Sequence, residues 1–107
     1  MKNNNSAKFI KKSTGYVKAF DGTPIYYEER GEGDPIIFIY GIACLMNHWH
    51  LQVEHFSKTH KVILFDIRGH HKSNPVASVN NFKFEHLAFD IKSLMNHLDL
   101  KSAHFVG

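Results

Sequence analysis

Three short segments, residues 36–40, 62–65 and 103–106, constrain the fold of this chain most, because they are apolar at nearly every position. Alternating apolar and polar residues would indicate a strand that faces water on one side. A continuous apolar run is instead typical of a parallel strand that is covered by helices on both faces. The sequence therefore predicts three buried strands in one sheet.

Helical periodicity separates these three segments. Apolar residues recur at helical spacing over residues 46–56, where Asn47 is expected to be the N-cap, and again over residues 87–98. Buried strands that alternate with helices are joined by right-handed crossovers into a parallel sheet. We therefore predict an α/β fold.

Two further segments, residues 16–20 and 25–29, precede the first buried strand and are rich in aromatic and β-branched residues. Asp21-Gly22 lies between them, and this dipeptide is a strong signal for a tight turn between antiparallel strands. We expect one domain over residues 15–107 that opens with this hairpin. A basic, disordered tail over residues 1–14 is expected to precede it.

The formal net charge of +3 comes from the start of the chain. Residues 1–12 contain four lysines and no acidic residue, so that the rest of the chain holds 9 basic and 10 acidic residues. A short basic terminus is more typical of a solvated tail than of a phosphate-binding arm, so we expect no nucleic acid partner. The four lysines are Lys2, Lys8, Lys11 and Lys12.

The chain contains 9 histidines, which raises the question of a metal site. His48-x-His50 and the adjacent His70-His71 lack the helical i, i+4 spacing and the cysteine pairs of common zinc sites, so we expect no metal. The single cysteine, Cys44, cannot form a disulfide within the chain. It is interpreted as a small core residue.

No segment is long enough to span a membrane as a helix. The longest apolar run, residues 36–46, has 11 residues, whereas a spanning helix needs about 20. Lysine and asparagine side chains interrupt the first 20 residues, so no signal peptide is predicted either. We expect a cytoplasmic protein without membrane contact.

The functional residues are expected just after the buried strands, because open α/β sheets bind ligands beyond the carboxyl ends of their strands. Tyr40-Gly41-Ile42-Ala43 follows the first buried strand, residues 66–73 follow the second, and Gly107 follows the third. A glycine at a strand end allows backbone N–H groups to approach a ligand oxygen closely.

These residues resemble the amino-terminal part of the α/β-hydrolase family, in its branch of small esterases, lactonases, carbon–carbon bond hydrolases, epoxide hydrolases and cofactor-free haloperoxidases. The most specific match is Asp-Ile-Arg-Gly-His-His-Lys-Ser at residues 66–73, which is similar to D-x-R-G-x-G-x-S. Pro-Ile-Ile-Phe-Ile-Tyr-Gly at residues 35–41 resembles the strand before the His-Gly oxyanion segment, and Trp49 matches a tryptophan of the first helix. The resemblance covers residues 15–107.

The resemblance implies a role for the backbone of residues 40–42. The N–H of Ile42, which follows Gly41, would donate to the oxyanion, with a second N–H coming from the residue after the nucleophile. Tyr40 stands where the family usually has histidine. The hydrogen bonding that shapes this loop is therefore expected to differ from the family pattern.

The loop over residues 66–73 is interpreted as structural. Asp66, Arg68, Gly69 and Ser73 match the family motif, and a hydrogen bond between Asp66 and Arg68 is expected to tie the loop. His71 stands at the second glycine of the motif, where a positive φ would suit histidine less well than glycine.

Gly107 matches the first glycine of G-x-S-x-G, so the nucleophile, the acid and the catalytic histidine would follow it. The resemblance implies a serine-type hydrolase of a small ester, lactone, carbon–carbon or epoxide-like substrate, with neither metal nor organic cofactor. We expect the 107 residues alone to be inactive, as an incomplete α/β-hydrolase sheet that self-associates through residues 103–106. A hydrolase completed by a second segment, a gene remnant, and a non-catalytic protein that binds a partner through its open sheet edge are the alternatives.

Overall fold

The computed structural model of this chain describes residues 12–107. The expected tail lies outside the described residues up to position 11, and its last three residues, 12–14, belong to the first strand. Five strands form one mixed sheet in the order β1-β2-β4-β3-β5. The strands are β1 (Lys12–Lys18), β2 (Pro24–Arg30), β3 (Pro35–Phe38), β4 (Lys61–Phe65) and β5 (His104–Val106), and the α-helices are α2 (His50–Phe56) and α3 (Phe84–His97).

The sheet has an antiparallel part and a parallel part. β1 pairs antiparallel with β2, and β2 pairs antiparallel with β4. β3 is parallel both to β4 and to β5, which lies at the edge of the sheet. The hairpin predicted from Asp21-Gly22 is confirmed, since Gly22 has a φ of 87° in the turn that joins β1 to β2.

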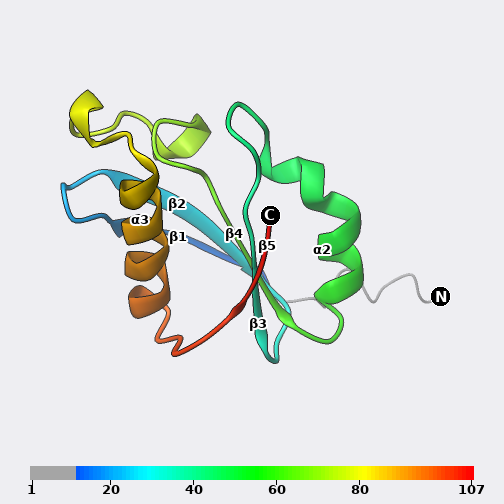
Figure 1. The fold of residues 1–107 in the computed structure, drawn as a ribbon. Coiled ribbons are helices and arrows are strands. Elements are labelled where there is room, and N and C mark those ends of the chain that lie inside the picture. Colours follow the sequence, from blue (N-terminus) through cyan, green and yellow to red (C-terminus); the bar gives the residue numbers. More distant parts are fainter. Residues whose placement is uncertain (1–11) are drawn as a thin grey trace.

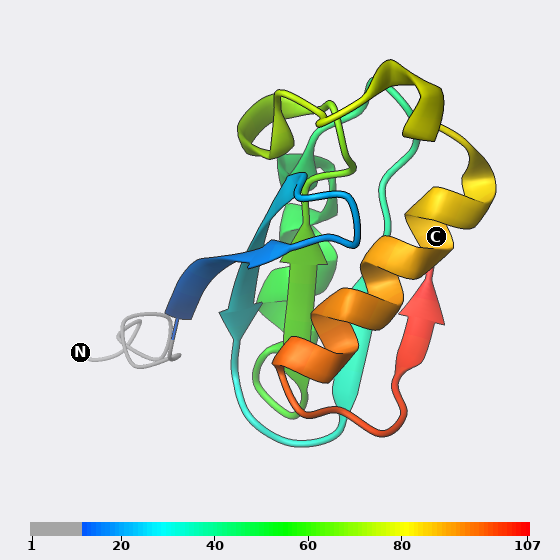
Figure 2. The same cartoon turned by 90° about the vertical axis from the view of Figure 1, so that its left-hand side faces the viewer.

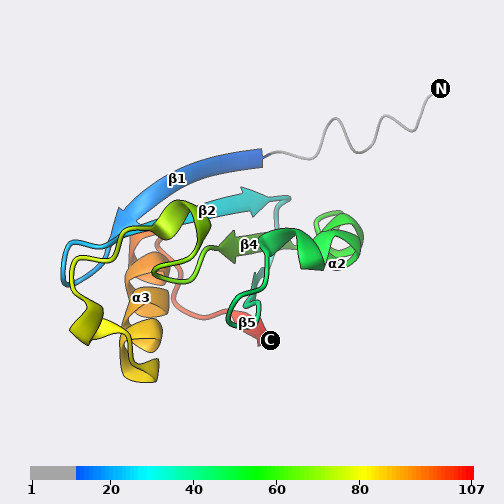
Figure 3. The same cartoon turned by 90° about the horizontal axis from the view of Figure 1, so that it is seen from above.

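Helices cover the two faces of the sheet, with α3 on one side and α2 on the other (Figures 1 and 3). Ile37 of β3 and Ile63 of β4 point to the face of α3, where they join Leu94 in one fully buried cluster. Phe38 and its neighbours on alternate positions pack on the other face, against Val53 of α2. Because successive side chains of a strand point to opposite faces, the cover on both faces explains the continuous apolar runs of β3 and β4. The prediction that the third run is also buried is wrong, because β5 lies at the edge of the sheet and its three residues are exposed.

The segment before α2 differs from the expected helix over residues 46–56. Met46–Trp49 forms a 3₁₀ turn, and α2 begins only at His50, with Trp49 at the N-cap. The prediction that Asn47 caps the helix is wrong, because Asn47 lies inside the 3₁₀ turn, where its carbonyl oxygen is 3.1 Å from Nδ1 of His50. Trp49 packs on Phe38 with 5.1 Å between the ring centroids.

Among the helices in residues 12–107, none combines the length and the apolar character that crossing a membrane would require.

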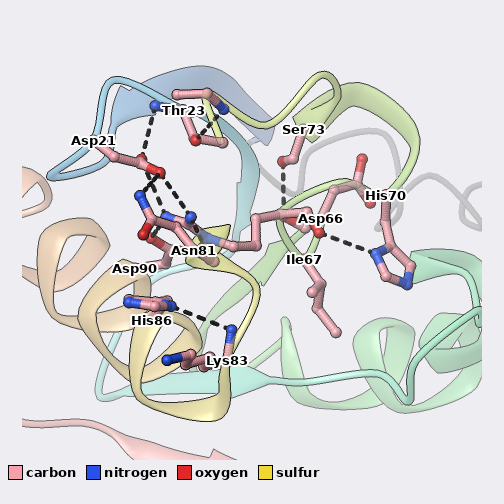
Figure 4. Close-up of polar contacts among 12 residues, drawn as sticks. Asp21, Thr23, Asp66, Ile67, His70, Ser73, Asn81, Lys83, His86 and Asp90 are labelled. Carbon is pink, nitrogen blue, oxygen red and sulfur yellow. Dashed lines mark hydrogen bonds and ion pairs between the residues drawn. The ribbon is translucent and has the colours of Figure 1, made fainter. Parts of the chain in front are cut away.

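Arg68, in the loop after β4, is completely buried and forms the main polar contact between distant segments. Its Nε donates to Asp90 of α3 at 2.7 Å, and its Nη1 donates to Asp21 of the hairpin turn at 2.9 Å and to the carbonyl oxygen of Asn81 at 2.8 Å. Figure 4 shows Asp21, Asn81 and Asp90 gathered on one side of this loop. Arg68 therefore joins the hairpin, the loop after β4 and α3.

The expected pairing of Arg68 with Asp66 is wrong. Arg68 extends between the hairpin turn and α3, where two carboxylates meet its guanidinium. The carboxylate of Asp66 turns toward the end of β3 and accepts from the hydroxyl of Tyr40 at 3.1 Å and from the backbone N–H of Lys72 at 3.1 Å. The two side chains are thus satisfied by different partners.

Replacing Arg68 with methionine tests this contact, because it leaves the carboxylates of Asp21 and Asp90 buried without their cation. Loss of one partner of a buried ion pair costs about 3–5 kcal/mol. Lys61→Met is the matched control, since Lys61 is about one-third exposed in its pair with Glu29, and such surface pairs contribute about 0–1 kcal/mol. Urea unfolding of both variants gives the two losses, and equal losses would contradict the role of Arg68.

Acid is expected to destabilise the fold through Asp21 and Glu28. Burial alone would raise the pKa of both carboxyls, but hydrogen bonds from Arg68 to Asp21 and from Tyr26 to Glu28 hold each pKa below its ordinary value of 3.8 or 4.5. A lowered pKa contributes stability that is present above the ordinary pKa and is lost as the pH falls below it. The free energy of unfolding should fall between about pH 5 and pH 2, and less steeply in Asp21→Asn. An unchanged slope in this variant would contradict the assignment to Asp21.

Candidate active site

The three segments singled out in the sequence come together at one edge of the sheet. β3, β4 and β5 are parallel, so their carboxyl ends face the same way (Figure 2). The N–H of Ile39 donates to the carbonyl oxygen of Val106 at 2.8 Å, which places the end of β5 beside the start of the loop after β3. Gly107 therefore lies next to the segment that contains Ile42.

Residues 40–44, which we call the oxyanion loop after the role that the resemblance implies for them, form a tight turn after β3. The N–H of Cys44 donates to the carbonyl oxygen of Gly41 at 2.9 Å, and Ala43 has a φ of 67°. The side chain of Ile42 is 54% exposed. Within residues 12–107, no group accepts a hydrogen bond from the Ile42 N–H.

Tyr40 anchors the oxyanion loop to the loop after β4. Its ring is 5% exposed. The hydroxyl donates to Asp66 at 3.1 Å and accepts from the backbone N–H of Ile67 at 3.0 Å. Burial raises the pKa of the Tyr40 phenol, which keeps the hydroxyl protonated as a donor. The sequence analysis expected the hydrogen bonds of this loop to differ from the family pattern, because Tyr40 stands in place of the usual histidine. These are the hydrogen bonds that Tyr40 makes.

The loop after β4 is held by hydrogen bonds within the loop and to β2. The hydroxyl of Ser73 donates to the carbonyl oxygen of Asp66 at 2.7 Å and accepts from the N–H of Tyr26 in β2 at 2.9 Å. Gly69 has a φ of 78°, and a Cβ on it would lie 2.9 Å from the ring of Phe82. The loop thus has a fixed shape against both β2 and the segment before α3.

Two adjacent histidines of this loop contact the oxyanion loop. Nε2 of His70 is 2.9 Å from the backbone nitrogen of Ala43, and Nε2 of His71 is 2.9 Å from the carbonyl oxygen of Cys44. His71 has the positive φ, 44°, that its place in the motif suggested. From the sequence, the two histidines were considered as possible metal ligands, and His71 as the residue at the second glycine of the motif. Their contacts with the oxyanion loop were not predicted. In the described residues, no three potential metal ligands come together.

An apolar hollow of about 330 Å³ lies beside Ile42. It forms where the oxyanion loop faces the start of α3, and only one of its side chains carries a charge. The hollow was not predicted from the sequence. Two closely spaced phenylalanines, Phe82 before α3 and Phe84 at its start, could have indicated an apolar surface there. The hollow is lined by Ile42, Phe82, Lys83, Phe84 and Leu87.

Comparison with protein families and curated proteins gives consistent matches. A family model described as "alpha/beta hydrolase fold" matches residues 34–107. A non-heme haloperoxidase of Rhodococcus erythropolis is 33% identical over 93 residues, which are 86% of this chain and 33% of the relative. Epoxide hydrolase 2 of Caenorhabditis elegans is 30% identical over 79 residues, which are 72% of this chain and 22% of the relative.

Solved structures share the same arrangement. An esterase of Exiguobacterium antarcticum has a TM-score of 0.80 and 27% identity, covering 89% of this chain and 35% of the esterase. Est816, described as an N-acyl homoserine lactone degrading enzyme, has a TM-score of 0.79 and 33% identity, covering 87% of this chain and 35% of the enzyme. This chain thus spans about a third or less of the length of these relatives.

Tyr40→Phe tests the anchor of the oxyanion loop. Removing the hydroxyl leaves a buried carboxylate oxygen of Asp66 and the N–H of Ile67 without their partner, which is expected to cost about 1–3 kcal/mol of unfolding free energy. Tyr16→Phe is the control, because the Tyr16 ring is 54% exposed and its change is expected to stay within about 0.5 kcal/mol. Chemical denaturation measures both variants, and a Tyr40→Phe protein as stable as the control would contradict the anchor.

Proposed function

Because this chain belongs to the α/β-hydrolase fold family, we propose that it supplies the oxyanion loop of a serine-type hydrolase. The observation that carries this proposal is the N–H of Ile42, which has no acceptor within residues 12–107 at the carboxyl end of β3. A preorganised backbone N–H stabilises an oxygen atom that gains negative charge in the transition state of acyl transfer. Its donation does not depend on the isoleucine side chain.

The remaining catalytic groups would follow Gly107 in the family pattern. That pattern places the serine, its adjacent N–H donor, the acid and the histidine after the first glycine of G-x-S-x-G. A chain without nucleophile and general base lacks the groups that form and resolve the acyl intermediate. We propose that the 107 residues alone do not turn over substrate, and that they act in a longer protein containing these groups.

The proposed substrate is a small ester, lactone, carbon–carbon or epoxide-like compound. Its apolar part would occupy the hollow beside Ile42, with its reacting oxygen at the Ile42 N–H. The mostly apolar lining supports this placement, because apolar ligand groups are bound by burial against apolar side chains. The relatives differ in named activity, and include an epoxide hydrolase, a haloperoxidase and an esterase.

Serine reactivity tests the proposal. The folded 107-residue chain should not react with a fluorophosphonate probe, whereas the product of the coding DNA read beyond the Gly107 codon should react. In that longer product, Ile42→Pro removes the proposed donor and is expected to lower kcat about 10²–10³-fold. Ile42→Val keeps the N–H and serves as the control. Labelling of the 107-residue chain, or equal rates in the two variants, would contradict the proposal.

A further inference from the structure

His70 and His71 reach across from the loop after β4 to the oxyanion loop, 27 residues earlier in the sequence. Their backbone is fixed locally, since the N–H of His70 donates to the carbonyl oxygen of Ile67 at 2.8 Å and the N–H of Ser73 donates to that of His70 at 2.8 Å. The backbone that carries the two rings is therefore held in place. The two contacts involve successive residues of the oxyanion loop, Ala43 and Cys44.

The partners of His70 determine which ring nitrogen carries the proton. The backbone nitrogen of Ala43 can only donate, so Nε2 of His70, at 2.9 Å, must be the unprotonated acceptor. Nδ1 then carries the hydrogen and donates to the carbonyl oxygen of Arg68 at 3.2 Å. Both contacts are made by a single form of the ring, the neutral imidazole with its hydrogen on Nδ1.

His71 makes the complementary contact. The carbonyl oxygen of Cys44 can only accept, so Nε2 of His71, at 2.9 Å, donates to it. His71 holds a φ of 44°, which is unfavourable for a residue with a Cβ. Glycine would adopt this backbone freely but has no ring to contact Cys44. The strained backbone is therefore accompanied by a contact that only the side chain provides.

Three rings surround His70. The ring of Tyr40 lies 6.0 Å from it and that of His71 lies 6.1 Å from it, centroid to centroid, and Phe82 stacks on it at 6.2 Å. Burial raises the pKa of Tyr40, so its phenol is uncharged. Lys83 follows Phe82 in the sequence and lines the neighbouring hollow. None of these groups carries a negative charge.

The charged groups of the loop after β4 have other partners. The guanidinium of Arg68 is bound to Asp21 and Asp90. The carboxylate of Asp66 accepts from the hydroxyl of Tyr40 and from the backbone N–H of Lys72. The ammonium group of Lys72 lies over the ring of Tyr26. Within residues 12–107, no carboxylate is paired with a histidine ring. A second proton on His70 would therefore place two donors, Nε2–H and the Ala43 N–H, face to face.

We propose that His70 and His71 are positioning residues that fix the oxyanion loop, and that the loop is fixed only while His70 is neutral. The N–H of Ile42 lies in the same planar peptide as the carbonyl group of Gly41, whose oxygen accepts from the N–H of Cys44 at 2.9 Å. Holding Ala43 and Cys44 therefore also holds the direction of the Ile42 N–H. Protonation of His70 releases Ala43 and lets the loop move. We call the two contacts, from His70 to Ala43 and from His71 to Cys44, the latch. Its effect on catalysis rests on the proposed function, whereas the contacts themselves do not.

Amide exchange and histidine NMR on the full chain test the latch. At neutral pH, the ¹⁵N signals of His70 should show the form with hydrogen on Nδ1, and the Ala43 amide should be protected. As the pH is lowered, Ala43 exchange, corrected for its intrinsic pH dependence, should rise about fivefold to tenfold, the effect of losing one hydrogen bond. This rise should follow the titration of the His70 signals. The Ser73 amide is the internal control and should stay protected.

Variants separate the latch from a merely structural role. His70→Phe keeps the stack on Phe82 but removes the acceptor, so Ala43 exchange should be about fivefold to tenfold faster at neutral pH. His70→Gln restores an acceptor that does not titrate, so Ala43 should remain protected in acid as well. His55→Gln, which changes an exposed histidine of α2, should behave as the unmodified chain.

Three results would overturn the latch: an Ala43 amide unprotected at neutral pH for any reason, a His70 ring with its hydrogen on Nε2, or unchanged Ala43 exchange in His70→Phe. These measurements need no turnover. A protein with the latch but no serine reactivity would contradict the proposed function alone. Serine reactivity in a longer product, together with an unprotected Ala43, would contradict the latch alone.

Discussion

A buried guanidinium must be surrounded by its counter-charges, and this requirement on Arg68 governs how three parts of the chain meet. Asp21 comes from the β1–β2 turn and Asp90 from α3, and both bind Arg68 at 2.9 Å or less. Neither carboxylate can move away without leaving a charge in the core uncompensated. The same residue also faces the candidate site, because its carbonyl oxygen lies 3.2 Å from Nδ1 of His70. The core ion pair and the oxyanion loop are therefore connected through one residue.

The parallel strands provide the second condition for the site. β3 and β4 are in register, with Ile37 opposite Ile63, so they end at the same level of the sheet. The loops that follow them are consequently close enough for the Tyr40 hydroxyl to bind both Asp66 and Ile67. A tyrosine at this position reaches across the gap between two strand ends. The departure from the usual histidine is thus accommodated by a different set of hydrogen bonds.

The sequence predicted those features that depend on local pattern or on burial of both sheet faces. The apolar runs that contain Ile37 and Ile63 and the Asp21-Gly22 turn belong to this class, and the structure confirms the α/β sheet. Side-chain pairing was predicted poorly, because Arg68 selects partners 47 and 22 residues away. His70 likewise meets Ala43 across 27 residues. Sequence spacing cannot reveal such contacts when the intervening segments determine which side chains meet.

The neighbours of Ile42 in the oxyanion loop are held by hydrogen bonds that leave the N–H of Ile42 without an acceptor among residues 12–107. Within the described chain, Tyr40 is bound through its hydroxyl, Ala43 through His70, and Cys44 through both Gly41 and His71. Backbone groups that have no partner in the protein are normally paired with water or ligand. Because the neighbours of Ile42 are all held, its N–H is fixed in direction while remaining without an acceptor. A donor that is both rigid and available needs little reorganisation to stabilise developing charge, which is the property an oxyanion hole requires.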